Sequence, residues 1–407
     1  MEKPSMIKRI LQIVVILALI AVASYFIFDL KPGIHHSKPK DKPTSIIASE
    51  DKVLNAISKA ENFLKTYQEE DGFFEKGLTA PKPALTCLVL DAFLHSPNNN
   101  TKNTPFIDKA LKAVLTCEND NGGFYNIKIL NLANYCTNLA IMVLHKADPE
   151  LYKEKIKKAA EFVKKSQLSG QEYSGGFGYD QGSAKADLSN TTASLESLKT
   201  VGELDEKTKA NAIKFIEQCQ NNSETNKLPW ASNDKSFIYR PGNSKAGSYF
   251  ENGQERFKGY GLMTYAGILS MIFADLDKSD PRVKGAMTWV EENFSLDDNI
   301  NLGKKGLYYY YVMMAKALNA YGEEKVITKD GRIHYWAKEL ADKIVKLQNE
   351  DGSFYNKDQQ DWLEGDSVLV TAYMLKTLSI CYKNIPKEDH IDNKKATPTS
   401  TSPEPNN

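Results

Sequence analysis

The chain has 407 residues, 41% of them hydrophobic, and its 52 basic residues balance its 52 acidic ones. A chain of this length and composition can bury a large core. It has no basic stripe interleaved with aromatic residues, which argues against a nucleic acid as partner. The five cysteines are odd in number and show no CxxC spacing. They indicate buried helix positions, not a disulfide framework or a zinc site.

The first hydrophobic segment, residues 10–28, contains no charged residue. As a helix it would span roughly 28 Å, close to the thickness of a bilayer core. Lys8 and Arg9 precede it, which predicts an uncleaved anchor whose N-terminus lies in the cytoplasm. The small residues at 21–23 leave a cleaved signal peptide as the alternative. We therefore expect a single-pass membrane protein whose folded domain lies on the extracytoplasmic side.

Beyond the anchor, the hydrophobic pattern predicts twelve helices of two alternating kinds. Val53, Ala56, Ile57 and Ala60 fall on one stripe, which is typical of a helix packed on one side. The next helix is apolar on most sides and should be buried. The striped, outer helices are predicted at 53–67, 106–116, 151–167, 207–219, 281–293 and 333–348. The apolar, inner helices are predicted at 83–95, 132–144, 187–201, 259–274, 306–320 and 366–381.

A Gly-aromatic motif separates the two helices of each pair. Its clearest copy runs from Leu347 to Tyr355, with the sequence Leu-Gln-Asn-Glu-Asp-Gly-Ser-Phe-Tyr. Looser copies recur upstream, at anchor positions roughly fifty residues apart, and a fixed period of that size indicates a repeat architecture. These anchors are Gln68, Cys117, Gln167 and Gln218.

Six such hairpins can close into a ring of inner helices covered by outer helices. Closure is favourable because an open solenoid would leave its first and last repeats uncovered. All hairpins run the same way, so the motif loops and the inner-helix N-termini share one rim. Helix dipoles converge there and would favour an anionic head group such as a diphosphate. The expected domains are an anchor (1–30), a Lys-, Pro- and Ser-rich tether (31–48), the helical ring (49–384) and a disordered tail (385–407).

The motif Gln-x-x-Asp-Gly-Ser-aromatic, which ends an outer helix at about fifty-residue spacing, resembles the repeat of squalene cyclases and protein-prenyltransferase β-subunits. The resemblance covers about residues 50–384. It implies an all-α fold, a terpenoid cyclase-like α/α toroid of six helical hairpins with a ligand cavity that opens on the loop rim. The same toroid serves cyclases, transferases and non-catalytic domains, so the resemblance alone does not fix the function.

Two functional elements of the family are missing from this sequence. Protonating cyclases carry an Asp-x-Asp-Asp-Thr-Ala element, and alignment on its Thr-Ala pair places Leu188, Asn190 and Thr191 at the acidic positions. Asparagine cannot protonate an alkene or epoxide. Prenyltransferases hold zinc at the rim, where none of the six histidines is expected; His334 is predicted to start an outer helix. We expect neither a metal nor a cofactor.

The candidate catalytic residues are three acids at inner-helix starts, Asp187, Glu364 and Asp366. They could form an acid/base pair over the cavity, although acids at these positions commonly cap helices. An insertion at 221–258 is predicted to cover the rim as a lid. The aromatic residues at the rim could bind a hydrophobic or cationic ligand, or they could pack in the hydrophobic core. The candidate ligand-binding residues are Asn190, Trp230, Arg240, Tyr260, Tyr265, Tyr308, Tyr309 and Trp362.

Three functions remain open from the sequence. The first is a membrane-anchored prenyltransferase- or squalene cyclase-like protein that binds or transforms a terpenoid or polyprenoid lipid. The second is a non-catalytic envelope binding or scaffold toroid. The third is a carbohydrate-active toroid, which would need two carboxylates facing each other across the cavity at roughly 5–10 Å. The expected partners are a hydrophobic or lipid-like small molecule and the membrane, through residues 10–28.

Overall fold

The computed structural model describes residues 50–74, 83–98, 104–126, 132–170 and 172–386. The chain divides into two units, Met1–Ile46 and Ile47–Asn407, and the described residues all belong to the second. The predicted anchor, the tether and nearly all of the tail lie outside the described residues. Among the helices that are described, none has the length and hydropathy that crossing a bilayer requires.

The described residues contain twelve α-helices that alternate between an outer and an inner position. The outer helices are α2 (Glu50–Lys65), α4 (Pro105–Leu115), α6 (Lys153–Lys165), α8 (Glu206–Cys219), α10 (Pro281–Asn293) and α12 (Trp336–Leu347). The inner helices are α3 (Ala84–His95), α5 (Ala133–Ala147), α7 (Leu188–Thr200), α9 (Gly261–Phe273), α11 (Leu307–Tyr321) and α13 (Ser367–Asn384). Each predicted helix is present, with ends displaced by three residues at most.

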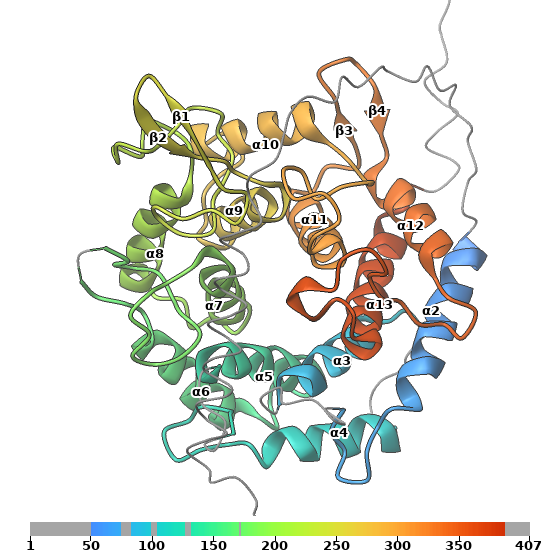
Figure 1. The fold of residues 1–407 in the computed structure, drawn as a ribbon. Helices are drawn as coiled ribbons and strands as arrows, with labels where there is room; N and C mark the ends of the chain where they lie inside the picture. Colours follow the sequence, from blue (N-terminus) through green and yellow to red (C-terminus); the bar gives the residue numbers. More distant parts are fainter. Residues whose placement is uncertain (1–49, 75–82, 99–103, 127–131, 171, 387–407) are drawn as a thin grey trace, which may run out of the picture. The chain divides into compact units, whose positions relative to one another are not determined.

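The inner helices form a closed ring, which Figure 1 shows end-on. Each packs against the next from α3 to α13, and α13 packs against α3. The outer helices cover this ring, and α2 lies against both α12 and α13, so the first and last hairpins are neighbours. Inner helices such as α9 are buried on nearly all sides, whereas α2 buries a single stripe. The predicted α/α toroid of six helical hairpins is confirmed.

The motif loops attach to the inner helices through one recurring hydrogen bond. In five hairpins the backbone N–H of the loop phenylalanine donates to a threonine hydroxyl on the following inner helix. These pairs are Phe74–Thr86, Phe124–Thr137, Phe177–Thr191, Phe237–Thr264 and Phe354–Thr371. A buried backbone N–H is thereby satisfied by a side chain of the helix on which the loop packs.

The motif glutamines attach four of the hairpins to their neighbours. The Nε2 of Gln68 donates to Phe106 O on α4, and that of Gln348 donates to Ala56 O on α2, each at 2.9 Å. The second of these bonds closes the ring. In the fourth hairpin the residue in this role is Gln220, which donates to Arg282 O at 2.9 Å, so the predicted anchor Gln218 is wrong by two positions.

Two short antiparallel hairpins interrupt the helices. The insertion carries β1 (Ser248–Glu251) and β2 (Gln254–Phe257). The second pairs β3 (Val326–Ile327) with β4 (Ile333–His334), so His334 lies in a strand and the prediction that it starts a helix is wrong. Gly331, at φ 83°, makes the turn that returns the chain to pair with β3 before α12 begins.

Candidate functional site

A central cavity of about 460 Å³ lies among the N-terminal ends of the inner helices. Its apolar wall consists of Ala84, Leu85, Leu88, Leu132, Leu262, Met263, Leu363 and Leu369. Six tyrosines and one tryptophan complete much of the lining: Tyr135, Tyr179, Tyr239, Tyr260, Tyr309, Tyr373 and Trp362. The remaining lining residues are Ser189, Asn190, Lys245 and Asp366. Trp362 and Leu363 are 38% and 58% exposed, which places them at the mouth.

The tyrosines form an ordered wall. The ring of Tyr309 stacks on that of Tyr373, with centroids 5.5 Å apart and an interplanar angle of 29°. The Tyr309 hydroxyl lies 3.1 Å from the Ser189 hydroxyl and so links α11 to α7 across the ring. Burial raises the pKa of Tyr309 to about 12. At neutral pH this wall therefore presents uncharged aromatic faces and hydroxyls.

Asp187 is the N-cap of α7. Its Oδ1 accepts a hydrogen bond from the Asn190 backbone N–H and its Oδ2 accepts one from Asn190 Nδ2, both at 2.9 Å. Burial raises the pKa of the Asp187 carboxyl, while the Asn190 hydrogen bonds and the positive charge of Arg240 oppose that rise. Asp187 does not line the cavity but fixes Asn190, which does. The Oδ1 of Asn190 is buried and has no hydrogen-bond partner among the described residues.

Glu364 is fully buried and faces the start of α11. Its Oε1 accepts from the Tyr309 backbone N–H at 2.8 Å and its Oε2 accepts from Asn356 Nδ2 at 2.7 Å. Gly306, the residue before α11, has no side chain with which to cap that helix. Glu364 supplies the missing cap from another hairpin, and it is absent from the cavity lining. Burial raises the pKa of its carboxyl to about 7.

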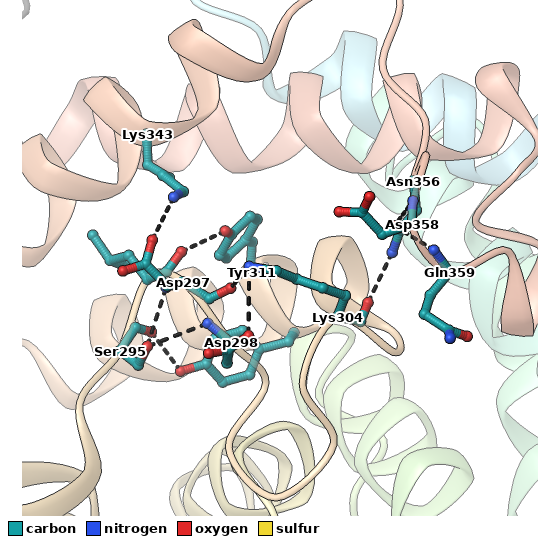
Figure 2. A network of polar contacts seen from close by, with 11 residues as sticks. Ser295, Asp297, Asp298, Lys304, Tyr311, Lys343, Asn356, Asp358 and Gln359 are labelled. Carbon is teal, nitrogen blue, oxygen red and sulfur yellow. Dashed lines mark hydrogen bonds and ion pairs between the residues drawn. The ribbon is translucent and has the colours of Figure 1, made fainter. Parts of the chain in front are cut away.

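Figure 2 shows polar contacts that fix the loop before α11 to the loop after α12. Asn356 Nδ2 also donates to Lys304 O at 2.8 Å, which links the loop after α12 to the loop before α11. The second loop is held by an ion pair between Lys343 and Asp297 at 2.5 Å. The hydroxyl of Tyr311 donates to Leu296 O at 2.6 Å. The two loops that position the Glu364 carboxyl group are thus joined to each other and to α12.

Asp366 lines the cavity and also caps α13, because its Oδ1 accepts from the Leu369 backbone N–H at 2.8 Å. Among the described lining residues it is the only one with a carboxyl group. The predicted acid/base pair is therefore not assembled in the cavity. Each of the three candidate acids, Asp187, Glu364 and Asp366, holds the start of an inner helix.

The candidate ligand-binding residues divide into two groups. Asn190, Tyr260, Tyr309 and Trp362 line the cavity. The other four do not, and each packs elsewhere: Tyr265 against Tyr310, Tyr308 against Tyr311, Trp230 edge-on to Phe257, and Arg240 over the ring of Tyr239. The placement of Tyr265 and Tyr308 in the cavity wall is therefore wrong, whereas Trp230 and Arg240 were expected in the insertion over the rim and stay predictions.

Sequence reasoning missed Tyr135, Tyr179, Tyr239, Tyr373 and Lys245, which line the cavity. The sequence contained a signal for two of them. The threonine that binds each motif loop shows which face of its inner helix points toward that loop, and so which face points toward the cavity. Tyr135 comes two residues before Thr137, and Tyr373 comes two residues after Thr371. On one helix, a position two residues before the threonine and a position two residues after it would be four apart and would lie on the same face. The equivalent positions of α5 and α13 therefore both point into the cavity.

The ring of six hairpins around one cavity defines a terpenoid cyclase-like α/α toroid. Residues 45–131 and 126–298, together more than half of the chain, match the prenyltransferase alpha-alpha toroid domain. The chain belongs to this family. No curated protein matches it in sequence.

Solved structures show the same fold at low identity. A variant of the type II terpene cyclase MstE from Scytonema, in complex with its product merosterolic acid A, is 11% identical with a TM-score of 0.51. The match covers 83% of this chain and 99% of that one. The GH76A alpha-1,6-mannanase from Salegentibacter sp. HEL1_6 is 10% identical with a TM-score of 0.53, over 80% of this chain and 99% of that one.

Proposed function

We propose that the protein binds a terpenoid or polyprenoid lipid in the central cavity. The observation that supports the proposal is the composition of the cavity lining, which consists mainly of leucine side chains and tyrosine rings at the ends of the six inner helices. Burying a hydrocarbon chain against such a wall is favourable by about 0.8 kcal/mol per methylene group. Among the similar structures, a variant of the cyclase MstE is in complex with geranylgeranyl dihydroxybenzoate, its substrate, which supports this ligand class.

Binding fits the site better than proton-initiated cyclisation. A cyclase must bring a carboxylic acid to an alkene, and Asp366 is the only acid in the described lining. Its Oδ1 is already engaged with the start of α13. We therefore infer a binding role and keep transformation of the lipid as the alternative.

The carbohydrate-active alternative requires two carboxylates that flank one bond. Glu364 is buried against α11 and Asp187 against Asn190, and neither lines the cavity. The described lining therefore lacks such a pair, so the shared fold with the mannanase does not support this function.

Lipid retention tests the proposal. We expect mass spectrometry of organic extracts of the purified protein to find an isoprenoid, because the cavity should retain its ligand. Leu88→Trp should lower retention by about tenfold, since Leu88 lines the cavity and the larger side chain would fill the space of roughly one isoprene unit.

Leu151→Trp is the matched control, because Leu151 is 70% exposed and lies outside the lining, and it should retain the lipid. Circular dichroism verifies that both variants fold. Absence of a bound lipid, together with no binding of added geranylgeraniol by the wild type, would contradict the proposal.

We also propose that residues 10–28 anchor the protein in a membrane and that the toroid faces away from the cytoplasm. Lys8 and Arg9 support this orientation. A protease added to intact cells should digest the toroid. Protection until the cells are lysed would reverse the orientation.

A further inference from the structure

The central cavity has one amine in its described lining. Lys245 is the only lysine there, and it is exposed, which places it at the mouth. Its Nζ lies 4.9 Å from the centre of the Tyr239 ring, which also lines the cavity. Backbone hydrogen bonds between Arg240 and Asn243 close a turn that folds the chain back, so that Lys245 meets Tyr239. A ligand whose chain lies in the cavity would therefore place its outer end beside this amine.

Lys245 lacks the acidic partner that lysines of the inner helices have. Lys316 pairs with Glu196 at 2.5 Å, and Lys376 pairs with Asp91. Within the described residues, Lys245 forms no ion pair with a carboxylate. An amine without such a partner loses its proton more readily than a paired one, because no nearby negative charge stabilises the ammonium form.

Two further cations act on this amine. The Arg240 guanidinium carbon lies 4.7 Å from the centre of the ring that Lys245 contacts. Burial lowers the pKa of Lys245, and the positive charges of Arg240 and Lys305 lower it further. Asp187 is the acid that opposes this shift, but Asn190 donates to both of its carboxyl oxygens. Apolar surroundings and neighbouring cations make a lysine nucleophilic, because they raise the fraction of neutral amine.

We propose that Lys245 captures an isoprenoid aldehyde covalently, as an imine that forms while the hydrocarbon chain lies in the cavity. This assignment rests on the proposed function for the chain and adds the chemical class of its outer end. The Nζ lone pair forms a bond to the carbonyl carbon, and one Nζ proton moves to the oxygen. The second Nζ proton then leaves with the hydroxyl group as water, so that a C=N bond replaces the C=O bond. The step consumes no oxidant or reductant.

The cavity distinguishes Lys245 from the lysines of the outer surface. A surface lysine meets an aldehyde only by collision, whereas a chain held against the leucines and tyrosine rings of the lining keeps its carbonyl carbon beside Nζ. The same apolar wall reduces the access of water, which would hydrolyse the imine. Both effects favour capture at this one position.

Reductive trapping on the detergent-solubilised full chain tests the proposal. Geranylgeranial is added in equimolar amount, sodium cyanoborohydride converts an imine into a stable secondary amine, and peptide mass spectrometry locates the added geranylgeranyl group. We expect Lys245 to carry about tenfold to a hundredfold more label than Lys258, an exposed lysine of the same insertion outside the lining. Arg240→Gln should lower the labelling of Lys245 severalfold, because one of the cations that favour the neutral amine is removed.

Lys245→Arg is the matched variant, because arginine keeps the positive charge but has no amine that forms an imine. It should lose the label, whereas Lys258→Arg should keep it. Circular dichroism verifies that both variants fold. If Lys245→Arg does not fold, the position of the label in the wild type decides.

The outcomes separate the imine site from the proposed function. Equal labelling of Lys245 and Lys258, in a protein that binds geranylgeraniol, would overturn the imine site and leave the proposed function standing. If geranylgeraniol does not bind, the proposed function fails and an isoprenoid aldehyde is no longer the ligand. Butanal, a short water-soluble aldehyde, is then the second probe. Selective labelling of Lys245 by butanal would support a reactive amine for a smaller carbonyl compound, and unselective labelling would overturn the site as well.

Discussion

Gly352→Ala is expected to destabilise the protein by more than about 3 kcal/mol, or to prevent closure of the ring. Gly352 has a φ of 89°, and a Cβ placed there would lie 2.4 Å from the carbonyl oxygen of Lys59. That oxygen belongs to α2, the first outer helix, and Gln348 bonds to the same helix at Ala56. The substitution would therefore push apart the contact that joins the last hairpin to the first.

The control for Gly352→Ala is Gly331→Ala. Gly331 has a nearly equal φ of 83°, but no atom lies within 4 Å of its added Cβ. Gly331→Ala should lower the free energy of unfolding by about 1–2 kcal/mol, which is the cost of a left-handed backbone conformation for alanine. Urea unfolding followed by circular dichroism compares the two. Equal losses would mean that the approach of Gly352 to α2 does not matter for stability.

Glu364→Ala is expected to cost about 2–4 kcal/mol, because the start of α11 would lose its only side-chain cap and Asn356 would lose a buried acceptor. Asp361→Ala is a control in the same segment. Asp361 is exposed and makes a single 3.4 Å ion pair with Lys305, so its loss should be within about 1 kcal/mol. Similar losses for both variants would show that the cap on α11 contributes little.

The same carboxyl group makes stability depend on pH. Its pKa rises from an ordinary value of 4.5 to about 7 in the folded protein, so the folded state holds this proton more tightly than the unfolded state. Stability from this group is therefore complete below pH 4.5 and declines as the pH rises to about 7, by on the order of 3 kcal/mol. Glu364→Gln should remove this decline. An unchanged pH profile in that variant would show that Glu364 does not titrate in this range.

The fold could be predicted from the sequence because the same pattern of residues recurs in each hairpin. A striped helix, a glycine with positive φ and an apolar helix recur, and neighbouring copies bury one another. The β3–β4 hairpin was missed because Ile333 and His334 continue an apolar pattern into α12. At two residues per strand, periodicity cannot separate strand from helix.

The site was predicted less well. The position of a residue along an inner helix indicates how far it lies from the rim, but it does not indicate whether its side chain points into the cavity. Consecutive residues on a helix differ by about 100°. Of the four consecutive tyrosines, only Tyr309 lines the cavity, whereas Tyr310 and Tyr311 turn outward and donate to Ser295 O and Leu296 O. The long insertion is harder still, because no periodicity relates Tyr239 and Lys245 to the helices that they meet.

The contact between α2 and the last hairpin makes the order of hairpins cyclic. Every hairpin has a neighbour on each side, and in four of the six a loop glutamine bonds to the next outer helix. A circular permutant that joins the end of α13 to the start of α2, and opens the chain at another motif loop, would therefore retain every interhelical contact except those of the opened loop. The bond between Gln348 and Ala56, now spanning most of the sequence, would become a local contact that forms early in folding.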